Sequence, residues 1–273
     1  MTTSNMAREE KIEDFLRKVE SAPLSVLLLD YDGTLAPFLI NRHRAVPYAG
    51  VVDVLQRIAD RGRTRLVVVT GRDAHEIGPL LGIKPPLEVW GAHGLQRLRP
   101  NGTCETPEIP ADVAPSLENA RQWLNYQGLL DLAEFKPGSI AVHWRALDEA
   151  AAFKLRSRIV LGWSHMIQQG ALNLLEFDGG VELRITQIDK GDVVRTILGE
   201  ISPEVPVAYL GDDATDEHAF QALAHRGLAV LVRPKSRRTS AQAWLRAPQQ
   251  LLDFLHSWDK ATESKPKAYC ATR

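Results

Sequence analysis

The chain has 273 residues, of which 44% are hydrophobic and 25% charged, as in an ordinary soluble globular protein. Lys and Arg number 33, Asp and Glu number 34, and the net charge is −1. This balance argues against nucleic acid as the main partner, because phosphate backbones call for a basic excess. The length suits one large α/β domain or two modest ones, with a core that needs no disulfide or metal for stability.

Two cysteines, Cys104 and Cys270, lack the spacing of a metal site, so we expect reduced thiols. The first ten residues contain no apolar stretch of the kind found in signal peptides. Apolar runs also stay well short of the roughly 18 residues that span a membrane. We therefore expect a cytoplasmic protein that acts as a monomer, without a membrane or nucleic-acid partner.

Helices and short, wholly apolar strands alternate in the first part of the chain. An amphipathic helix before Pro23 is followed by a strand at Ser25 to Leu29, a helix at Ala49 to Asp60, a strand at Leu66 to Val69, a helix at Asp73 to Leu81, and a hairpin of Leu87 to Trp90 and Leu95 to Leu98. Apolar runs without alternation are typical of strands buried on both faces. The pattern therefore predicts a doubly wound parallel sheet, an α/β fold.

A proline-rich stretch from Pro100 to Pro115 marks a domain boundary. Beyond it the pattern predicts a helix at Ser116 to Tyr126, a strand at Ser139 to Trp144, a helix at Asp148 to Leu161, and a hairpin of Leu172 to Phe177 and Val181 to Arg184 that turns at Asp178-Gly179-Gly180. These elements predict a small α+β insert.

The strand–helix alternation resumes after the insert. It predicts a helix from Asp189, a strand at Val207 to Leu210, a helix at Thr215 to His225, a strand at Leu228 to Val232, and a last helix that contains Leu251, Leu252 and Leu255. We therefore predict a core of residues 1–108 and 184–258, an insert at 109–183, and a disordered tail at 259–273.

Polar groups follow three of the predicted strands at the point where each strand ends. These segments are Asp30-Tyr31-Asp32-Gly33-Thr34, Thr70-Gly71-Arg72 and Gly211-Asp212-Asp213, and Lys190 opens a helix in the same half of the chain. Ligands of open α/β sheets bind beyond the carboxyl ends of the strands. We therefore expect these groups to converge on one crevice.

The chemistry of these groups suits magnesium-dependent phosphoryl transfer. The four acids Asp30, Asp32, Asp212 and Asp213 repel one another unless a cation is present, and oxygen ligands suit Mg²⁺. The hydroxyl of Thr70, the glycine amides and Lys190 suit a phosphoryl group. Asp32-Gly33 alone would indicate only a turn after a strand.

Taken in chain order, the three polar segments and Lys190 resemble the four motifs of the haloacid-dehalogenase-like phosphatases. The last, Gly211-Asp212-Asp213-Ala214-Thr215-Asp216-Glu217, is similar to that of the trehalose-6-phosphate phosphatase family in particular. Three further segments are similar to that family: Gly91-Ala92-His93-Gly94, His143-Trp144-Arg145 and Val181-Glu182-Leu183-Arg184. The resemblance covers Leu24 to Leu255 and implies a Rossmann-type core with an inserted, mobile cap.

The resemblance also implies roles for the motif residues. Asp30 is expected to be the nucleophile that becomes an aspartyl-phosphate, and Asp32 the acid and base that serves the leaving group and the water. Mg²⁺ is expected on Asp30, the carbonyl of Asp32, and Asp212.

Two more acids and two groups of the second motif complete the expected site. Asp213 is expected at the metal site behind the direct ligands, where it would hold water or Lys190. Asp216 is expected to act in the same way. Thr70 and the Gly71 amide are expected to bind the phosphoryl oxygens.

The cap is expected to recognise the rest of a phosphorylated disaccharide. Candidate sugar contacts are Lys136, His143, Arg145, Glu176 and Glu182 from the cap, with His93 from the core. Arg72 is a further candidate for substrate binding. Glu176 is favoured because it ends an apolar run. For each of these charged residues the alternative is a solvated surface, and for Arg72 a helix start or a positioning group.

Several functions are compatible with these residues. The first hypothesis is a Mg²⁺-dependent phosphatase of trehalose 6-phosphate. The chain has Ile185 where the family typically has Pro, so a phosphatase of sucrose 6-phosphate or glucosylglycerol phosphate is the second. A phosphosugar-binding domain without turnover and a phosphomutase are further alternatives. The basic run Arg233, Lys235, Arg237 and Arg238 is interpreted as a solvated loop rather than an anion patch.

Overall fold

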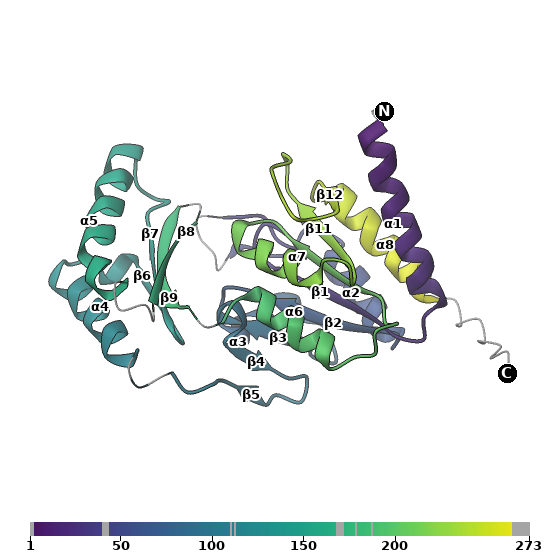
Figure 1. Ribbon diagram of the computed structural model, residues 1–273, viewed down its shortest axis with the longest axis horizontal. Coiled ribbons are helices and arrows are strands. Elements are labelled where there is room, and N and C mark those ends of the chain that lie inside the picture. The colour runs from purple at the N-terminus through teal and green to yellow at the C-terminus, as the bar shows by residue number, and fades with distance from the viewer. Residues whose placement is uncertain are drawn as a thin grey trace.

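The computed structural model describes residues 3–39, 44–109, 111, 113–167, 172–177, 179–186 and 188–263, and side chains from residue 10 onward. A larger core unit and a smaller unit lie side by side, each built on its own sheet (Figure 1). The predictions for residues 264–273, Cys270 and Asp178 lie outside the described residues. None of the described helices combines the length and apolar character needed to cross a bilayer.

The core unit contains an eight-stranded sheet with a parallel body and an antiparallel edge. Its spatial order is β12 (Ala243–Leu245), β11 (Leu228–Val232), β10 (Val207–Gly211), β1 (Ser25–Leu29), β2 (Thr64–Val69), β3 (Glu88–Gly91), β4 (Gln96–Leu98) and β5 (Cys104–Glu105). Neighbours from β12 to β3 run parallel, and β4 and β5 are antiparallel. This confirms the predicted doubly wound sheet and its edge hairpin.

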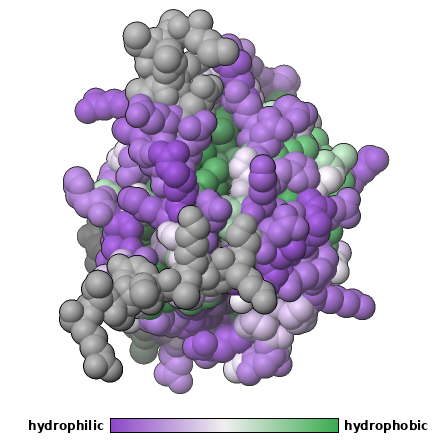
Figure 2. All heavy atoms as spheres, turned by 90° about the vertical axis from the view of Figure 1, so that its right-hand side faces the viewer, coloured by the Kyte–Doolittle hydropathy of each residue, from purple (hydrophilic) through white to green (hydrophobic). Residues whose placement is uncertain are grey.

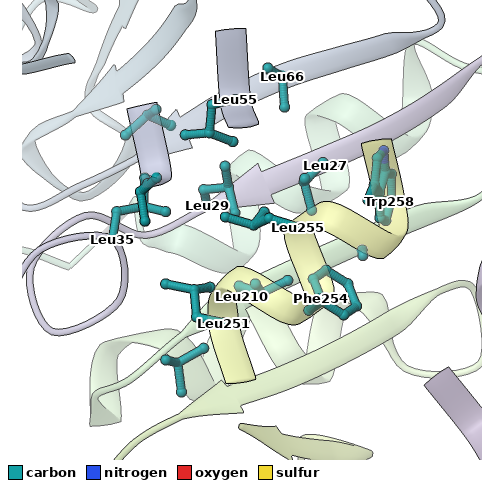
Figure 3. Packing of buried hydrophobic residues seen from close by; sticks show 14 of the residues in the cluster. Leu27, Leu29, Leu35, Leu55, Leu66, Leu210, Leu251, Phe254, Leu255 and Trp258 are labelled. Carbon is teal, nitrogen blue, oxygen red and sulfur yellow. The ribbon is translucent and has the colours of Figure 1, made fainter. Parts of the chain in front are cut away.

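Helices cover both faces of this sheet, which explains why its strands show no hydrophobic alternation. On one face lie α1 (Thr3–Ser21), α2 (Val51–Asp60), α3 (Ala74–Leu81) and α8 (Gln249–Glu263), and on the other α6 (Lys190–Gly199) and α7 (Glu217–Leu223). In β1, Leu27 and Leu29 pack into the first layer, and Val26 and Leu28 into the second. Figure 3 shows α8 laying Leu255 and Trp258 over this first layer.

The far end of the core unit, which carries α1 and α8, has a largely hydrophilic surface, with hydrophobic residues visible only between polar ones (Figure 2). The buried side of α1 contributes Phe15, whose ring lies 5.9 Å from that of Trp258. The predicted amphipathic helix before Pro23 is therefore confirmed as a layer of the core.

The smaller unit is an antiparallel sheet with two helices on one face. Its strand order is β6 (Ala133–Lys136), β7 (Ser139–His143), β9 (Gly180–Ile185) and β8 (Leu172–Phe177), and its helices are α4 (Ala114–Tyr126) and α5 (Glu149–Ile167). Trp123 and Trp163 meet edge to face at 6.4 Å between α4 and α5. Trp163 and Trp258 are fully buried, the first in the smaller unit and the second in the core unit.

Several element boundaries differ from the prediction. Residues 259–263 continue α8 rather than starting a disordered tail, because Asp259 accepts hydrogen bonds from Arg57 (2.8 Å) and Arg61 (3.2 Å) of the neighbouring helix end. Helix α5 continues to Ile167, past the predicted end at 161, and β9 runs to Ile185, past the predicted boundary at 183. The short strands β5, β6 and β12 were not predicted.

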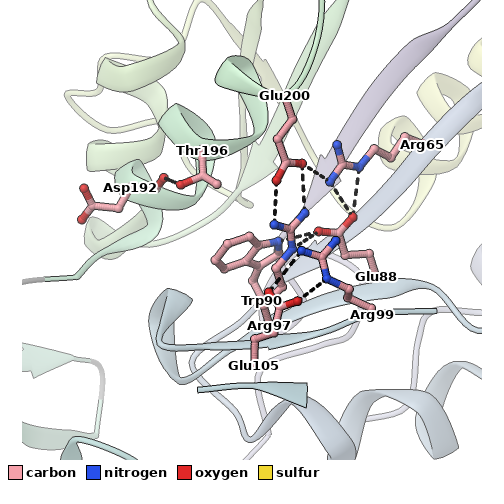
Figure 4. A network of polar contacts seen from close by, with 9 residues as sticks. All are labelled: Arg65, Glu88, Trp90, Arg97, Arg99, Glu105, Asp192, Thr196 and Glu200. Atoms are coloured by element: carbon pink, nitrogen blue, oxygen red, sulfur yellow. Dashed lines mark hydrogen bonds and ion pairs between the residues drawn. The ribbon is translucent and has the colours of Figure 1, made fainter. Parts of the chain in front are cut away.

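A network of charged side chains ties the end of α6 to the sheet edge (Figure 4). Glu88 accepts from Arg65 and Arg97, and the Arg97 guanidinium also holds both carboxylate oxygens of Glu200, at 2.6 and 2.9 Å. Since α6 begins at Lys190, this anchor at its far end helps to fix the helix that delivers Lys190.

We expect Glu200 to give the fold an acid-sensitive contribution. The hydrogen bonds from Arg97 and Arg65 lower the pKa of Glu200 from 4.5 to about 2, although partial burial opposes them. A carboxyl group whose pKa is lower in the folded state stabilises the protein at pH values above its ordinary pKa. This stabilisation is lost as the pH falls through the folded-state pKa. The difference in melting temperature between wild type and Glu200→Gln should therefore shrink as the pH falls from about 4.5 towards about 2. Glu118→Gln, an exposed change on α4, is the control, and a constant difference would contradict the assignment.

Candidate active site

The three polar segments meet at the carboxyl edge of the core sheet, because β10, β1 and β2 are neighbours in that order. They form the floor of a crevice. The smaller unit is the cap, and its sheet forms the roof of the crevice. The crevice is lined by Asp30, Asp32, Phe38, Leu39, Gly71, Arg72, His93, Glu134, Lys136, His143, Arg145, Leu175, Phe177, Glu182, Lys190, Asp212, Asp213 and Thr215. The convergence predicted from the strand ends therefore occurs in the folded chain.

Lys190 lies at the centre of the floor and is buried, with 3% of its side chain exposed. Its Nζ donates to Asp30 Oδ1 and to Asp216 Oδ1, both at 2.7 Å. The capping box of Asp189 and Asp192 fixes the first turn of α6, so the helix start holds Lys190 in place.

Asp216 is a positioning group whose hydrogen-bonding capacity is filled. Its Oδ1 accepts from Lys190 and from the Tyr209 hydroxyl, each at 2.7 Å, and its Oδ2 accepts from the backbone N–H groups of Asp212 and Asp213, each at 3.0 Å. A carboxylate offers about four lone-pair sites, and four donors occupy them here. The expected contact between Asp216 and Lys190 is present in the structure.

The acids of the floor carry strongly perturbed pKa values. Burial raises the pKa of Asp30 above its ordinary 3.8, the charge of Lys190 opposes it, and Asp216 and Asp32 add to it. Burial likewise raises the pKa of Asp212 well above 3.8, with the charges of Asp30, Asp216 and Asp213 adding. Each of these carboxylates is therefore stabilised by any additional positive charge in the crevice.

The arrangement fits a small divalent cation. One carboxylate oxygen from each of Asp30, Asp212 and Asp216 lies within 4.8 Å of the others. Within the described part of the chain, Asp30 Oδ2 is buried and has no hydrogen-bond partner. Because Asp216 is already saturated, Asp30 and Asp212 are the carboxylates that can bind an ion, and hard oxygen donors suit Mg²⁺.

Asp213, expected in the metal site, has a different contact. Its side chain accepts from the N–H of Ala214 at 2.7 Å and so caps the short 3-10 helix that precedes α7. The backbone of Gly33, in the first motif, lies close to the Asp212 carboxylate. A Cβ on Gly33, which has φ +85°, would lie 2.1 Å from Asp212 Oδ2. Only glycine fits there.

Asp32 is paired with Arg72, which is 3% exposed. Arg72 Nε donates to Asp32 Oδ2 at 2.6 Å and Nη2 donates to Oδ1, so the contact is bidentate. The guanidinium also lies over the Tyr31 ring, 5.0 Å from its centroid. Of the two interpretations of Arg72, the structure supports the positioning group, because the side chain fixes the carboxylate of Asp32.

The segment after β2 forms the wall next to Asp32. Thr70 is buried and its hydroxyl accepts from the N–H of Arg72 at 3.1 Å. The Gly71 carbonyl accepts from Lys136 of the cap at 3.0 Å. A Cβ on Gly71 would lie 2.6 Å from the His93 ring, so the glycine permits the close packing of His93.

Two charged cap residues reach the core across the crevice. Lys136 on β6 contacts Glu182 at 2.9 Å as well as the Gly71 carbonyl, and Glu182 on β9 contacts His93 Nε2 at 3.0 Å. Ser139 donates to Glu182 at 2.7 Å. The predicted residues Lys136, Glu182 and His93 are therefore brought together as one polar cluster.

The electrostatics of this cluster are coupled. Burial opposes ionisation of Glu182, but the charge of Lys136 and the hydrogen bonds from His93 and Ser139 outweigh it and hold the pKa of Glu182 well below 4.5. Burial lowers the pKa of His93, although the charge of Glu182 opposes the shift. Glu182 is thus a carboxylate at neutral pH, able to accept hydrogen bonds from hydroxyl groups.

His143 and Arg145 also face the crevice. His143 Nε2 contacts Glu134 Oε2 at 3.0 Å, and the Arg145 guanidinium lies 3.9 Å from the centroid of Phe38, a core residue that follows the first motif. Both predicted positions therefore lie where a ligand bound between cap and core would contact them.

The prediction of a sugar contact at Glu176 is wrong. Side chains alternate along β8, so Leu175 and Phe177 line the crevice while Glu176 points to the helical face of the cap. There Glu176 accepts from Arg156 of α5 at 2.6 and 2.8 Å, and this pairing lowers the pKa of Glu176.

Two residues of the site, Glu134 and Tyr209, are not among those predicted from the sequence. Glu134 stands two residues before Lys136 on β6, so both side chains lie on one face of the strand. A strand prediction for Ala133–Lys136 would have found it. Tyr209 lies within an apolar strand, and the sequence carries no signal that its hydroxyl reaches Asp216.

Comparisons with known proteins agree with this arrangement. The family described as Trehalose-phosphatase matches residues 28–249. A trehalose-phosphate phosphatase of Mycobacterium marinum is 29% identical over 246 residues, which are 86% of this chain and 61% of that protein. This chain therefore spans about three fifths of the length of that relative.

Solved structures share the fold. The C-terminal domain of Candida albicans trehalose-6-phosphate phosphatase superposes with a TM-score of 0.78 at 20% identity, covering 91% of this chain and 96% of that one. A phosphatase of the haloalkanoate (HAD) superfamily from Bacteroides thetaiotaomicron gives a TM-score of 0.56 at 17% identity, covering 86% and 95%. The fold is that of the haloacid-dehalogenase-like proteins. Since the family model matches most of the chain, the chain belongs to the trehalose-phosphatase family.

We expect Asp216→Asn to destabilise the fold. An amide cannot accept from donors on both sides, so either Lys190 and Tyr209 or the two backbone N–H groups would face another donor. Breaking a buried ion pair costs about 3–5 kcal/mol, which should appear in urea unfolding with chelator present. Asp213→Asn is the matched control, because asparagine also caps helices and should cost less than about 1 kcal/mol. Equal stability of the two variants would show that Asp216 does not organise the floor.

Proposed function

We propose that this protein is a Mg²⁺-dependent phosphatase that hydrolyses trehalose 6-phosphate to trehalose and phosphate. The observation that carries the proposal is the pairing of Lys190 with Asp30, whose second oxygen is buried without a hydrogen-bond partner in the described residues. A carboxylate held by one oxygen, with its other oxygen facing a crevice, is arranged as a nucleophile.

The reaction begins with attack of the Asp30 carboxylate on phosphorus. The bond from phosphorus to the sugar oxygen breaks, and Asp32, once it has left its ion pair with Arg72 and taken up a proton, gives that proton to the sugar oxygen. The product is an aspartyl-phosphate on Asp30 and free sugar. Asp32 then takes a proton from a water molecule that attacks the phosphorus, which releases phosphate and restores Asp30.

Charge on the phosphoryl oxygens is met by fixed donors of the chain. The Thr70 hydroxyl accepts from Arg72, so its own proton remains available for a phosphoryl oxygen, and the Gly71 N–H lies beside it. Lys190 offers positive charge next to Asp30. Preorganised donors of this kind carry most of the catalysis in phosphoryl transfer.

Asp30, Asp212 and the carbonyl of Asp32 are the groups that would hold Mg²⁺. When bound, the ion supplies positive charge that offsets the negative charge of the phosphoryl group and of the acids. Asp216 fixes the backbone from which the Asp212 side chain extends.

The cap would bind the sugar. Glu134, Lys136 and Glu182 line the roof of the crevice and offer acceptors and donors to sugar hydroxyls, and His143 and Arg145 stand beside them. The crevice is about 120 Å³, well below the roughly 300–1,000 Å³ of small-molecule sites, so we infer that the cap moves outward to admit a disaccharide.

The first test is phosphate release from a substrate panel, with Mg²⁺ and with chelator. The panel holds trehalose 6-phosphate, sucrose 6-phosphate, glucosylglycerol phosphate, glucose 6-phosphate and p-nitrophenyl phosphate. We expect a strong preference for trehalose 6-phosphate that chelator removes. Asp30→Asn should lower turnover by about 10⁴-fold or more, with an unchanged circular dichroism spectrum. Preference for another sugar would move the function to a sister phosphatase, and activity in Asp30→Asn would exclude the mechanism.

The sugar end of the site has its own test. Glu134→Gln should lower kcat/KM for trehalose 6-phosphate by about ten- to a hundredfold, because a charged hydrogen-bond acceptor is lost. The same variant should hydrolyse p-nitrophenyl phosphate as wild type does, since that substrate has no sugar. Glu176→Gln removes the same charge from the opposite face of the cap sheet and serves as the control. An equal effect of Glu134→Gln on both substrates would refute a sugar contact.

A further inference from the structure

The segment between β11 and β12, residues 233–242, contains the basic run that the sequence analysis interprets as a solvated loop. That interpretation is wrong for Arg233 and Arg237, which point back at the segment after β10. Arg233 Nη1 donates to the carbonyl of Asp212 at 3.2 Å, and Arg237 Nη2 donates to the carbonyl of Asp213 at 2.8 Å.

These two contacts complete the hydrogen bonding of the backbone at Asp212 and Asp213, the acidic segment after β10. The N–H groups of Asp212 and Asp213 donate to Asp216, and their carbonyls accept from the two arginines. The backbone donors and acceptors of both residues are therefore occupied. The chain that carries the Asp212 carboxylate is fixed from both sides.

The basic loop is itself anchored to the start of α7. Arg237 Nη1 donates to Glu217 Oε1, Thr239 donates to the same oxygen at 2.8 Å, and the Ser240 N–H donates to Oε2 at 2.8 Å. These three bonds give the Arg237 guanidinium a defined position, with 27% of its side chain exposed. Two of its nitrogens thus join Glu217 to the Asp213 carbonyl.

At the other end of the loop, the Trp244 indole donates to the carbonyl of Arg233 at 2.8 Å, which ties this segment to β12. The loop is thus fixed at both ends while its two guanidinium groups reach the acidic segment. The guanidinium groups of Arg233 and Arg237 also place positive charge next to the carboxylates of the crevice floor.

We propose that Arg237, assisted by Arg233, is a positioning residue for the metal site: it holds the Asp212–Asp213 backbone so that the Asp212 carboxylate is preorganised for Mg²⁺. The inference rests on the proposed function for the identity of the ion. Partners behind metal ligands typically contribute about 10–100-fold in metal affinity. A guanidinium suits the role because its planar fork bonds two acceptors at once, which an ammonium group does less well.

The experiment is calorimetric titration of the whole chain with MgCl₂, without substrate. We expect Arg237→Gln to weaken Mg²⁺ binding about tenfold or more. Arg238→Gln is the matched control, because it removes the same charge from an exposed position in the same loop. It should bind Mg²⁺ as wild type does. Arg237→Gln should also regain most of its turnover at high Mg²⁺, so that the half-saturating Mg²⁺ concentration rises while kcat changes little.

Thermal unfolding in chelator identifies the folded variants. Should Arg237→Gln not fold, Arg237→Lys replaces it: the charge stays, the fork is lost, and Mg²⁺ affinity should still fall severalfold. Wild-type affinity in the folded Arg237 variant, or an equal loss in Arg238→Gln, would overturn the proposal. If wild type itself binds no Mg²⁺, it is the proposed metal dependence that fails.

Discussion

The buried ammonium group of Lys190 allows acidic side chains to gather at one edge of the core sheet. Asp30 and Asp216 both accept from it at 2.7 Å, within a site that excludes most water. Buried carboxylates are costly unless paired, and a pair gains only when the remaining lone pairs are also satisfied. Asp216 meets that condition with four donors, whereas Asp30 keeps one oxygen free. The asymmetry separates a structural acid, Asp216, from the proposed nucleophile, Asp30.

Much of this arrangement could be predicted from the sequence, because the information is local and repeated. Apolar runs such as Ser25 to Leu29 have no alternation, which requires cover on both faces, and each of the central strands ends in a polar motif. Parallel neighbours then bring those ends together by geometry alone. The convergence of Asp30, Thr70 and Asp212 follows without knowledge of any side-chain contact. The roles proposed for these residues came from the resemblance to known phosphatases.

The parts that could not be predicted depend on contacts between distant segments or on short strands. Glu176 ends an apolar run, but the face on which it lies depends on the register of β8, and that register sends it to Arg156. Asp259 is held in α8 by arginines some 200 residues earlier in the chain. Arg237 looks like a surface charge until the fold places the Asp213 carbonyl in its reach. Local composition carries no information on such partners.

Cap and core share polar groups, and under the proposed function this would link recognition of the sugar to binding of the phosphoryl group. Lys136 bonds both Glu182 and the carbonyl of Gly71, Glu182 bonds His93, and the His93 ring packs against Gly71. The Gly71 peptide is therefore fixed by the same residues that would bind sugar hydroxyls. A disaccharide that engages Lys136 and Glu182 must compete with these contacts. Under the proposed function, part of its binding energy would therefore go into rearranging the wall next to Asp32.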